Sequence, residues 1–250
     1  MCGRAYETYT DKELNARYIR GSPTADDIEQ LILMPQPVYN LCPTMNSPVL
    51  RVVDGSRRFD LMHWQLVPRY EHVFKTKLTT INAKSETVFR SSVFGELVER
   101  QRCIVPISGF YEWKRDGKTK RPFKIHLADE PIMSLAGVWD TWRPGSKQER
   151  SSFSILTTAA NAFMREIHDR MPVILGRADE EEWLDSEVHE QSLLQRMFKP
   201  CPSEWLTAVE VSPLVNSAKN NGPDLLKPAE PDQEGMKETN STLPLIFGQD

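Results

Sequence analysis

The residue with the clearest chemical potential is Cys2, which directly follows the initiator methionine. A small second residue generally allows Met1 to be removed, and Cys2 then carries an amine and a thiol on adjacent carbons. The α-amino group has a pKa near 7.7–8.0 against about 10.4 for lysine, so far more of it is uncharged at neutral pH. Such an amine can condense with an aldehyde to an imine, and the thiol can then close a five-membered thiazolidine. The alternative is that Cys2 has no chemical role.

Two titratable residues stand in contexts that suit acid–base chemistry. Glu112 lies among aromatic residues in Gly109–Trp113, where loss of water raises a carboxyl pKa towards neutrality. His168 lies in Ile167–Pro172, which we predict to close a helix, and the helix dipole there favours the protonated imidazole. The alternatives are an exposed carboxylate on an alternating strand for Glu112 and a helix-capping side chain for His168.

A polar segment over Thr80–Thr87 forms a third candidate feature, which we expect to be a loop entering a helix over Glu86–Arg100. Asn82 could hold an amine or a sugar oxygen, and Lys84 is well placed for a phosphate. The alternative is that the segment only caps the following helix.

The elements that must position these residues follow from the hydrophobic pattern. Runs of β-branched and aromatic residues predict strands over Val49–Val53, Phe59–Trp64, Ile104–Trp113, Phe123–Leu127, Ile132–Trp139 and Phe153–Thr157, with a hairpin turn at Asp116-Gly117. Helical spacing predicts helices over Asp26–Met34, Glu86–Arg100, Asn161–His168 and Glu187–Phe198. Strands and helices do not alternate regularly, so we expect the α+β class: a single domain with an antiparallel, β-rich, barrel-like core and surrounding helices.

Composition narrows the class of protein further. The chain has 250 residues and a net charge of −4, with no apolar run long enough for a membrane helix and no secretory signal pattern. The four cysteines lack metal-site spacing, so we expect reduced thiols in a cytoplasmic protein. Residues 51–125 carry 16 Lys and Arg against 8 Asp and Glu, a balance that suits a polyanion or ordinary surface charge.

Several sequence blocks occur in an order that points to one family. They are Cys2-Gly3-Arg4, Tyr39–Thr44, Trp64–Pro68, Asn82–Thr87, Arg102–Pro106, Gly109–Trp113, Thr157–Asn161, His168–Pro172 and Val215-Asn216-Ser217. In this order they resemble the SRAP family (SOS response-associated peptidases, or abasic-site processing proteins). The resemblance covers residues 1–228 as one domain, and we expect residues 229–250, rich in Pro, Glu, Gln, Ser and Thr, to form a disordered tail.

The resemblance implies a DNA–protein crosslinking enzyme for abasic sites in single-stranded DNA, with associated lyase and peptidase activity. It implies that Cys2 is the nucleophile, that Asn82 positions its amino terminus, and that Glu112 and His168 are the acid–base pair that also assists Met1 removal. The residues that would face DNA are Gly3, Arg4, Pro43, Trp64, Lys84, Trp113, Thr157 and Arg170. No metal or organic cofactor is expected, and the protein is expected to be a monomer, associated with the nucleoid or replication fork if bacterial.

The sequence departs from the family pattern at a few positions. Gln65 stands where the family has Gly, Tyr70 replaces a second Trp, Lys84 replaces a common Arg, and Gly95 lies near another expected Arg. These changes bear on DNA affinity more than on the crosslinking chemistry.

Two other functions remain open from the residues. One is a thiol peptidase or autopeptidase that uses Cys2 with Glu112 or His168 as base. The other is a non-catalytic reader of modified DNA bases. In the tail, Leu243–Phe247 resembles sliding-clamp-binding peptides of bacterial replication proteins, the alternative being a tail that folds back on its own domain.

Overall fold

The computed structural model describes residues 2–19 and 37–229, and strands dominate this part of the chain. The strands are β1 Ala5–Glu7, β2 Val38–Leu41, β3 Asn46–Val53, β4 Ser56–Trp64, β5 Asn82–Lys84, β6 Arg102–Ile107, β7 Gly109–Asp116, β8 Thr119–Leu127, β9 Met133–Trp142, β10 Arg150–Ala159, β11 Arg170–Pro172 and β12 Leu206–Glu210. The α-helices are α1 Asp11–Tyr18, α3 Gly95–Arg100, α4 Ala162–Arg165, α5 Arg177–Leu184 and α6 Gln191–Arg196. Short 3₁₀ turns are η1 Val88–Arg90, η2 Ser203–Trp205, η3 Pro213–Asn216 and η4 Pro223–Leu226.

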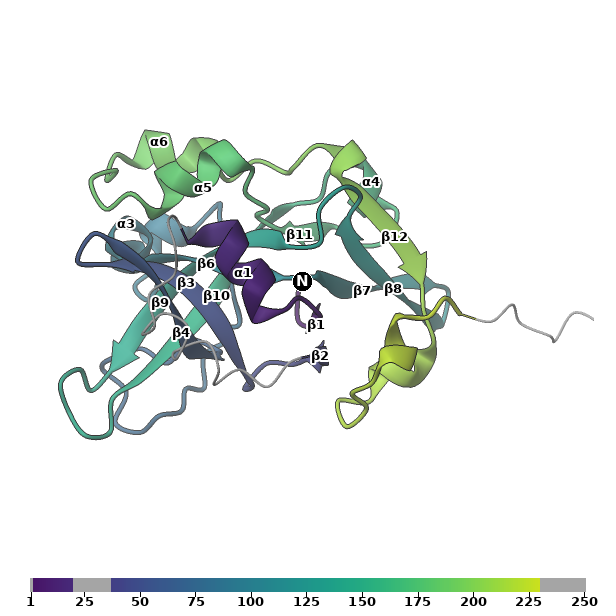
Figure 1. Ribbon diagram of the computed structural model, residues 1–250, viewed down its shortest axis with the longest axis horizontal. Coiled ribbons are helices and arrows are strands. Elements are labelled where there is room, and N and C mark those ends of the chain that lie inside the picture. Colours follow the sequence, from purple (N-terminus) through teal and green to yellow (C-terminus); the bar gives the residue numbers. More distant parts are fainter. Residues whose placement is uncertain (1, 20–36, 230–250) are drawn as a thin grey trace, which may run out of the picture.

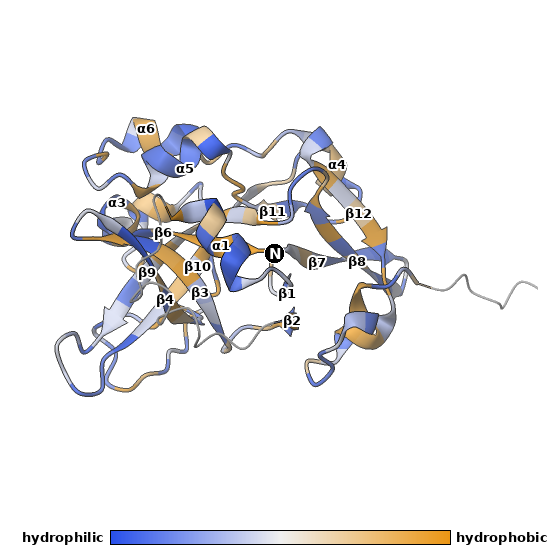
Figure 2. Cartoon of the chain, viewed as in Figure 1, coloured by the Kyte–Doolittle hydropathy of each residue, from blue (hydrophilic) through white to orange (hydrophobic). Residues whose placement is uncertain are grey.

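Five strands close into a barrel. Their order is β10-β4-β3-β6-β9, and β9 returns to pair with β10. Most pairs are antiparallel, whereas β10 runs parallel to β4 and to the short strand β5. The central strands are largely apolar, as their orange colour in Figure 2 shows, and residues such as Leu50, Ile104 and Val138 are fully buried. The expected class, α+β with an antiparallel, barrel-like core, is confirmed.

A second, five-stranded antiparallel sheet lies against the barrel, in the order β12-β8-β7-β1-β2. One buried cluster joins the two sheets, because Phe110 and Ile125 of the second sheet pack with Val105 and Met133 of the barrel. Strand β1 therefore starts in the middle of the molecule, between β7 and β2 (Figure 1). The amino-terminal residues lie in the core region between the sheets.

The strand predictions are confirmed with one correction. The predicted strand over Ile104–Trp113 is two strands, β6 and β7, divided at Ser108. Ser108 donates its backbone N–H to Tyr6 O (2.9 Å), and its hydroxyl accepts from the N–H of Thr8 (2.9 Å). These bonds turn the chain from the barrel into the second sheet. The hairpin turn at Asp116-Gly117 is confirmed, with Gly117 at φ +57°.

The predicted helix over Glu86–Arg100 is wrong as a continuous element. The segment forms the turn η1 and the helix α3, and the hydroxyl of Ser91 accepts from the N–H groups of Val93 and Phe94 between them. A side chain at Gly95 would come within 2.8 Å of the backbone oxygen of Phe89, which is closer than real contacts allow. The apolar spacing was therefore a correct indicator of burial but not of helix length.

The remaining helix predictions are confirmed in part. Residues 161–168 contain only the short α4, capped by Asn161, whose side chain accepts from the N–H of Met164 (2.8 Å). The predicted helix over Glu187–Phe198 is confirmed as the shorter α6, and α5 precedes it. Helices α3, α5 and α6 gather at one end of the barrel (Figure 1). The predicted helix over Asp26–Met34 and the tail peptide Leu243–Phe247 lie outside the described residues.

Candidate active site

Cys2 lies three residues before β1 and is fully buried. The side-chain amide Nδ2 of Asn82, at the beginning of β5, donates a hydrogen bond to the carbonyl oxygen of Cys2 (2.8 Å). The other amide atom, Asn82 Oδ1, is buried and makes no hydrogen bond with the described residues. The segment Thr80–Thr87, predicted as a loop, thus contains the short strand β5, and the pairing of β5 with β10 brings Asn82 to Cys2.

The pairing of β1 with β7 brings Cys2 near Glu112. Ala5 pairs with Phe110, and Arg4 O accepts from the N–H of Tyr111 (2.9 Å), so the same register sets Gly3 opposite Glu112. Burial, and to a smaller extent the nearby Glu112 carboxylate, raises the pKa of the Cys2 thiol to about 12. The thiol is therefore neutral in this environment.

Glu112 and His168 line one cavity. Its volume is about 420 Å³, within the range of small-ligand pockets. Glu112 is almost completely buried, and this burial raises its pKa, while the charge of His168 acts in the opposite direction. The other residues that line the cavity are Trp113, Arg115, Lys120 and Asn216.

His168 lies between α4 and β11, so the prediction that it closes a helix ended by Pro172 is wrong. The strand Arg170–Pro172 pairs with β10, and this pairing extends the chain. His168 Nδ1 accepts from the backbone N–H of Arg170 (3.0 Å), which leaves the proton of the neutral ring on Nε2. The exposed carboxylate of Asp169 lies 2.9 Å from the same Nδ1 and can accept from it once the ring is protonated.

Two of the residues expected to face DNA lie together beside the cavity. The guanidinium of Arg4 lies 5.8 Å from the ring centroid of Trp113. Arg4 also donates to Asn40 Oδ1 (2.8 Å) and to the carbonyl of Val215 (2.7 Å). Trp113 Nε1 donates to Asn216 Oδ1 (2.7 Å). These contacts fix both side chains at the rim, next to the half-buried Gly3.

Lys84, Thr157 and Arg170 form a second group on the barrel side. Lys84 is exposed and pairs in register with Thr157. Arg170 binds both carboxylate oxygens of Glu86 and donates to the carbonyl of Thr157 (2.7 Å). Thr157 has no exposed surface, so it supports Arg170 and cannot itself touch a DNA strand in this structure.

The expected role of Trp64 as a DNA-facing ring needs correction. Trp64 is fully buried, its ring stacks on Phe153 at 6.3 Å and 9°, and Nε1 donates to the carbonyl of Ile81 (3.0 Å). It packs the barrel beside Asn82. Tyr70, by contrast, is 61% exposed and Pro43 is half-buried. Among the aromatic residues expected to face DNA, Trp113 is the one that lines the cavity.

Gln65 adopts a backbone conformation that side chains disfavour. Its φ is +144°, in the region that glycine occupies most easily. This conformation gives a physical reason for the family's glycine at this position. The Gln65 amide donates to the carbonyl of Leu78 (3.4 Å).

Sequence reasoning missed four residues around the cavity: Asn40, Arg115, Lys120 and Asn216. Asn40 and Asn216 stand in blocks already noted for the family resemblance, which was the available signal. Arg115 and Lys120 belong to a basic hairpin that charge alone did not distinguish from ordinary surface.

Other kinds of site can be described briefly. All four cysteines, which lie within the described ranges, are free thiols. Within residues 2–19 and 37–229, no three His, Cys, Asp or Glu side chains are grouped to hold a metal ion. No helix in this same part of the chain has the length and apolar character needed to cross a membrane.

Comparisons with known proteins agree with this arrangement. A model of the family described as SOS response associated peptidase (SRAP) matches residues 1–218. The abasic site processing protein YoaM of Bacillus subtilis is 39% identical over 194 residues, which cover 76% of this chain and 85% of YoaM. The abasic site processing protein YedK of Escherichia coli is 30% identical over 233 residues, which cover 91% of this chain and 100% of YedK.

A solved structure from Bacteroides thetaiotaomicron has a similar fold and is 27% identical, with a TM-score of 0.78 over 92% of this chain and 100% of that one. The family model spans both sheets and every residue that lines the cavity. On these grounds the chain belongs to the SOS response associated peptidase (SRAP) family.

Proposed function

We propose that this chain processes abasic sites in single-stranded DNA by forming a covalent bond through Cys2. The relatives named abasic site processing proteins support the substrate class. The observation that carries the proposal is the hydrogen bond from Asn82 to the Cys2 carbonyl, beside a buried Glu112. This arrangement holds the first residues of the chain against an acid–base pair.

The chemistry begins with the amine of Cys2 after Met1 is removed. The amine attacks the aldehyde carbon of the ring-opened sugar, and loss of one water gives an imine. The sulfur then adds to the imine carbon, and the thiol proton passes to the nitrogen, which closes the thiazolidine. Because burial keeps the thiol neutral, the amine is the first nucleophile.

Glu112 and Asn82 have separate roles in this sequence. The raised pKa of Glu112 keeps its carboxyl group protonated to higher pH, so it can donate a proton to the departing water and to the opening sugar ring. The Oδ1 atom of Asn82, which has no partner in the described part of the chain, can accept a hydrogen bond from the Cys2 amine. His168, which lines the cavity with Glu112, exchanges protons with the reacting groups.

The same groups suit two further reactions of the family. We propose that Glu112 and His168 assist hydrolysis of the Met1–Cys2 peptide bond, which would liberate the amine. The imine form of the adduct also allows strand cleavage by proton removal next to the imine carbon, a lyase reaction. The hydrolysis releases the Cys2 amine and the lyase reaction uses it, so both reactions depend on the same site.

The proposal is tested with protein whose free Cys2 has been verified by intact mass. The protein is incubated with an oligonucleotide carrying one abasic site, and with the same strand lacking the site. We expect a denaturant-resistant species whose mass is protein plus DNA minus one water. One matched control is Cys2→Ser, which retains the amine but lacks the thiol. The other is a protein with Met1 retained, and we expect this second control to form no adduct.

Three outcomes decide among the candidate functions. Absence of the adduct with intact peptide turnover would favour a thiol peptidase. Equal DNA binding by Cys2→Ala, again without an adduct, would favour a non-catalytic reader of modified bases. An identical stable adduct from Cys2→Ser would contradict the thiazolidine.

A further inference from the structure

We propose that Arg115 and Lys120, on the hairpin β7–β8, bind a backbone phosphate of the DNA strand next to the captured nucleotide. The inference rests on the proposed function and extends it to the path of the strand. Both side chains line the cavity that Glu112 and His168 share. A phosphodiester strand that enters this cavity meets them beyond Trp113.

The register of the hairpin sets the two cations against each other. Arg115 pairs directly with Lys120, so the two side chains lie on one face of the sheet. Like charges in directly opposed positions destabilise a strand pair. Neither side chain makes an ion pair or a hydrogen bond with any residue of the described ranges. A bound anion would remove this repulsion.

Neighbouring cations on the same hairpin are compensated. Lys114 also faces a cation, Arg121, but Arg121 binds both carboxylate oxygens of Glu210 on β12 and lies 4.0 Å from Asp116. The repulsion between Lys114 and Arg121 is thereby offset within the protein. Within the described residues, no carboxylate forms such an ion pair with Arg115 or Lys120.

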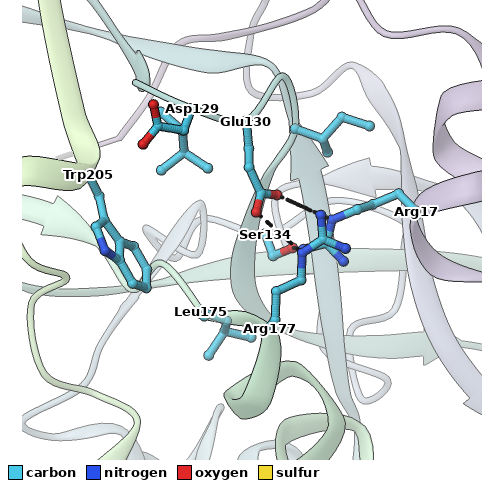
Figure 3. A pocket seen from close by; sticks show the side chains of 10 residues that line it. Arg17, Asp129, Glu130, Ser134, Leu175, Arg177 and Trp205 are labelled. Atoms are coloured by element: carbon cyan, nitrogen blue, oxygen red, sulfur yellow. Dashed lines mark hydrogen bonds and ion pairs between the residues drawn. The ribbon is translucent and has the colours of Figure 1, made fainter.

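A second cavity is also lined by two cations, but these are paired with carboxylates of the protein. It is lined by Arg17 and Arg177, and Figure 3 shows Glu130 between them. Glu130 lies 2.9 Å from Arg177 and 3.7 Å from Arg17, and Glu180 binds Arg17 with both oxygens. These arginines are already neutralised, so that cavity offers no anion site. Arg115 and Lys120 remain available to an external anion.

The position of Arg115 along strand β7 assigns the bound phosphate to a nucleotide that flanks the captured one. Arg115 is three residues from Glu112, which at about 3.4 Å per residue corresponds to roughly 10 Å. Trp113 lies between them, where a flanking base can stack. Lys84 lies on β5 of the barrel, next to Asn82, so the two cationic groups belong to different sheets. Together they would hold the strand on two sides of the captured nucleotide.

The experiment compares two double variants of the full chain that each remove two positive charges from the same hairpin. The test variant is Arg115→Gln with Lys120→Gln, and the control is Lys114→Gln with Lys118→Gln. Binding of an undamaged single strand is measured by fluorescence anisotropy over a range of salt concentrations. We expect the test variant to bind roughly tenfold more weakly. Its slope of log K against log salt should fall by about 0.7, the value for one phosphate on a single strand.

A chemical probe then locates the phosphate. Neutral methylphosphonate linkages are introduced one at a time along the oligonucleotide. With the wild-type protein, a neutral linkage at one position should weaken binding. With the test variant, the neutral linkage at that same position should weaken binding no further. Folding is checked by thermal unfolding, where the test variant should be at least as stable because a repulsion has been removed.

The outcomes separate this inference from the proposed function. Equal affinities and equal salt slopes for the two double variants would overturn the phosphate site, even if the wild type forms the Cys2 adduct. The wild type forming no adduct, with the affinity difference intact, would overturn the proposed function and leave the phosphate site standing.

Discussion

Glu112 combines deep burial with a titratable group, so its protonation affects stability as well as chemistry. Burial raises its pKa above the ordinary value of 4.5, so the folded protein holds a proton that the unfolded chain has released. Between pH 4.5 and the raised pKa, the free energy of unfolding of the wild type therefore falls as pH rises. We expect Glu112→Gln to lack this dependence. Each unit of pKa shift corresponds to about 1.4 kcal/mol, or roughly 3–6 °C in Tm at this chain length.

The measurement is thermal unfolding of both proteins at acidic and mildly alkaline pH. The Tm of Glu112→Gln should exceed that of the wild type by more at the higher pH. The rate of adduct formation should fall by about 10²- to 10⁴-fold, as expected for loss of a general acid. Parallel Tm curves for the two proteins would contradict the burial-driven shift.

The four catalytic candidates could be named from the sequence, but their surroundings could not. Cys2, Glu112 and His168 each stand in a distinctive local context, and Asn82 stands in a polar segment as a group that could hold an amine or a sugar oxygen. Burial of Trp64 was not predictable, because an aromatic residue at a strand end suits a core as well as a DNA surface. The Asn82–Cys2 contact joins residues 80 positions apart, and no local pattern reports such a pairing.

At the scale of elements, the position of Cys2 depends on the pairing of β1 with β7. Gly109 pairs with Tyr6, and a Cβ atom there would overlap the Ile125 carbonyl and the Tyr6 hydroxyl. We expect Gly109→Ala to destabilise the protein by about 1–3 kcal/mol or more and to lower the yield of adduct, because β1 must move.

Urea unfolding and adduct yield test this prediction together. The control is Gly222→Ala, because Gly222 has φ −169° and no atom within 4 Å of the added Cβ. An unchanged unfolding midpoint and yield for Gly109→Ala would show that β1 tolerates the displacement.

Strands were more predictable than helices for a physical reason. The β-branched, aromatic and other apolar residues of β3 and β4 mark these strands in the sequence, whereas α3 and α4 are too short for several helical repeats. The polar strand β5 lacked any alternating pattern, since its three residues are held by pairing with β10. Closure of the barrel through β9 and β10 is a long-range property that local spacing does not encode.

At the scale of the whole molecule, charge is unevenly distributed along an acidic chain. Residues 51–125 hold 16 Lys and Arg against 8 Asp and Glu, although the net charge is −4. This region includes β5 and the hairpin β7–β8, which flank the candidate active site. The basic region therefore attracts a polyanion to the site, while the net negative charge of the whole chain repels it. Salt screens both interactions.

This distribution predicts different salt dependence for encounter and for the finished adduct. Non-covalent binding of undamaged single-stranded DNA should weaken steeply between 50 and 200 mM salt, because released counterions drive it. The adduct should persist at both concentrations, since breaking it requires opening of the thiazolidine ring and hydrolysis of the resulting imine, and not dissociation of ions. Pre-formed adduct is transferred to high salt and followed on denaturing gels, in parallel with anisotropy of the undamaged strand. Loss of the adduct in step with loss of binding would mean that the complex is held by charge alone, against a covalent bond to Cys2.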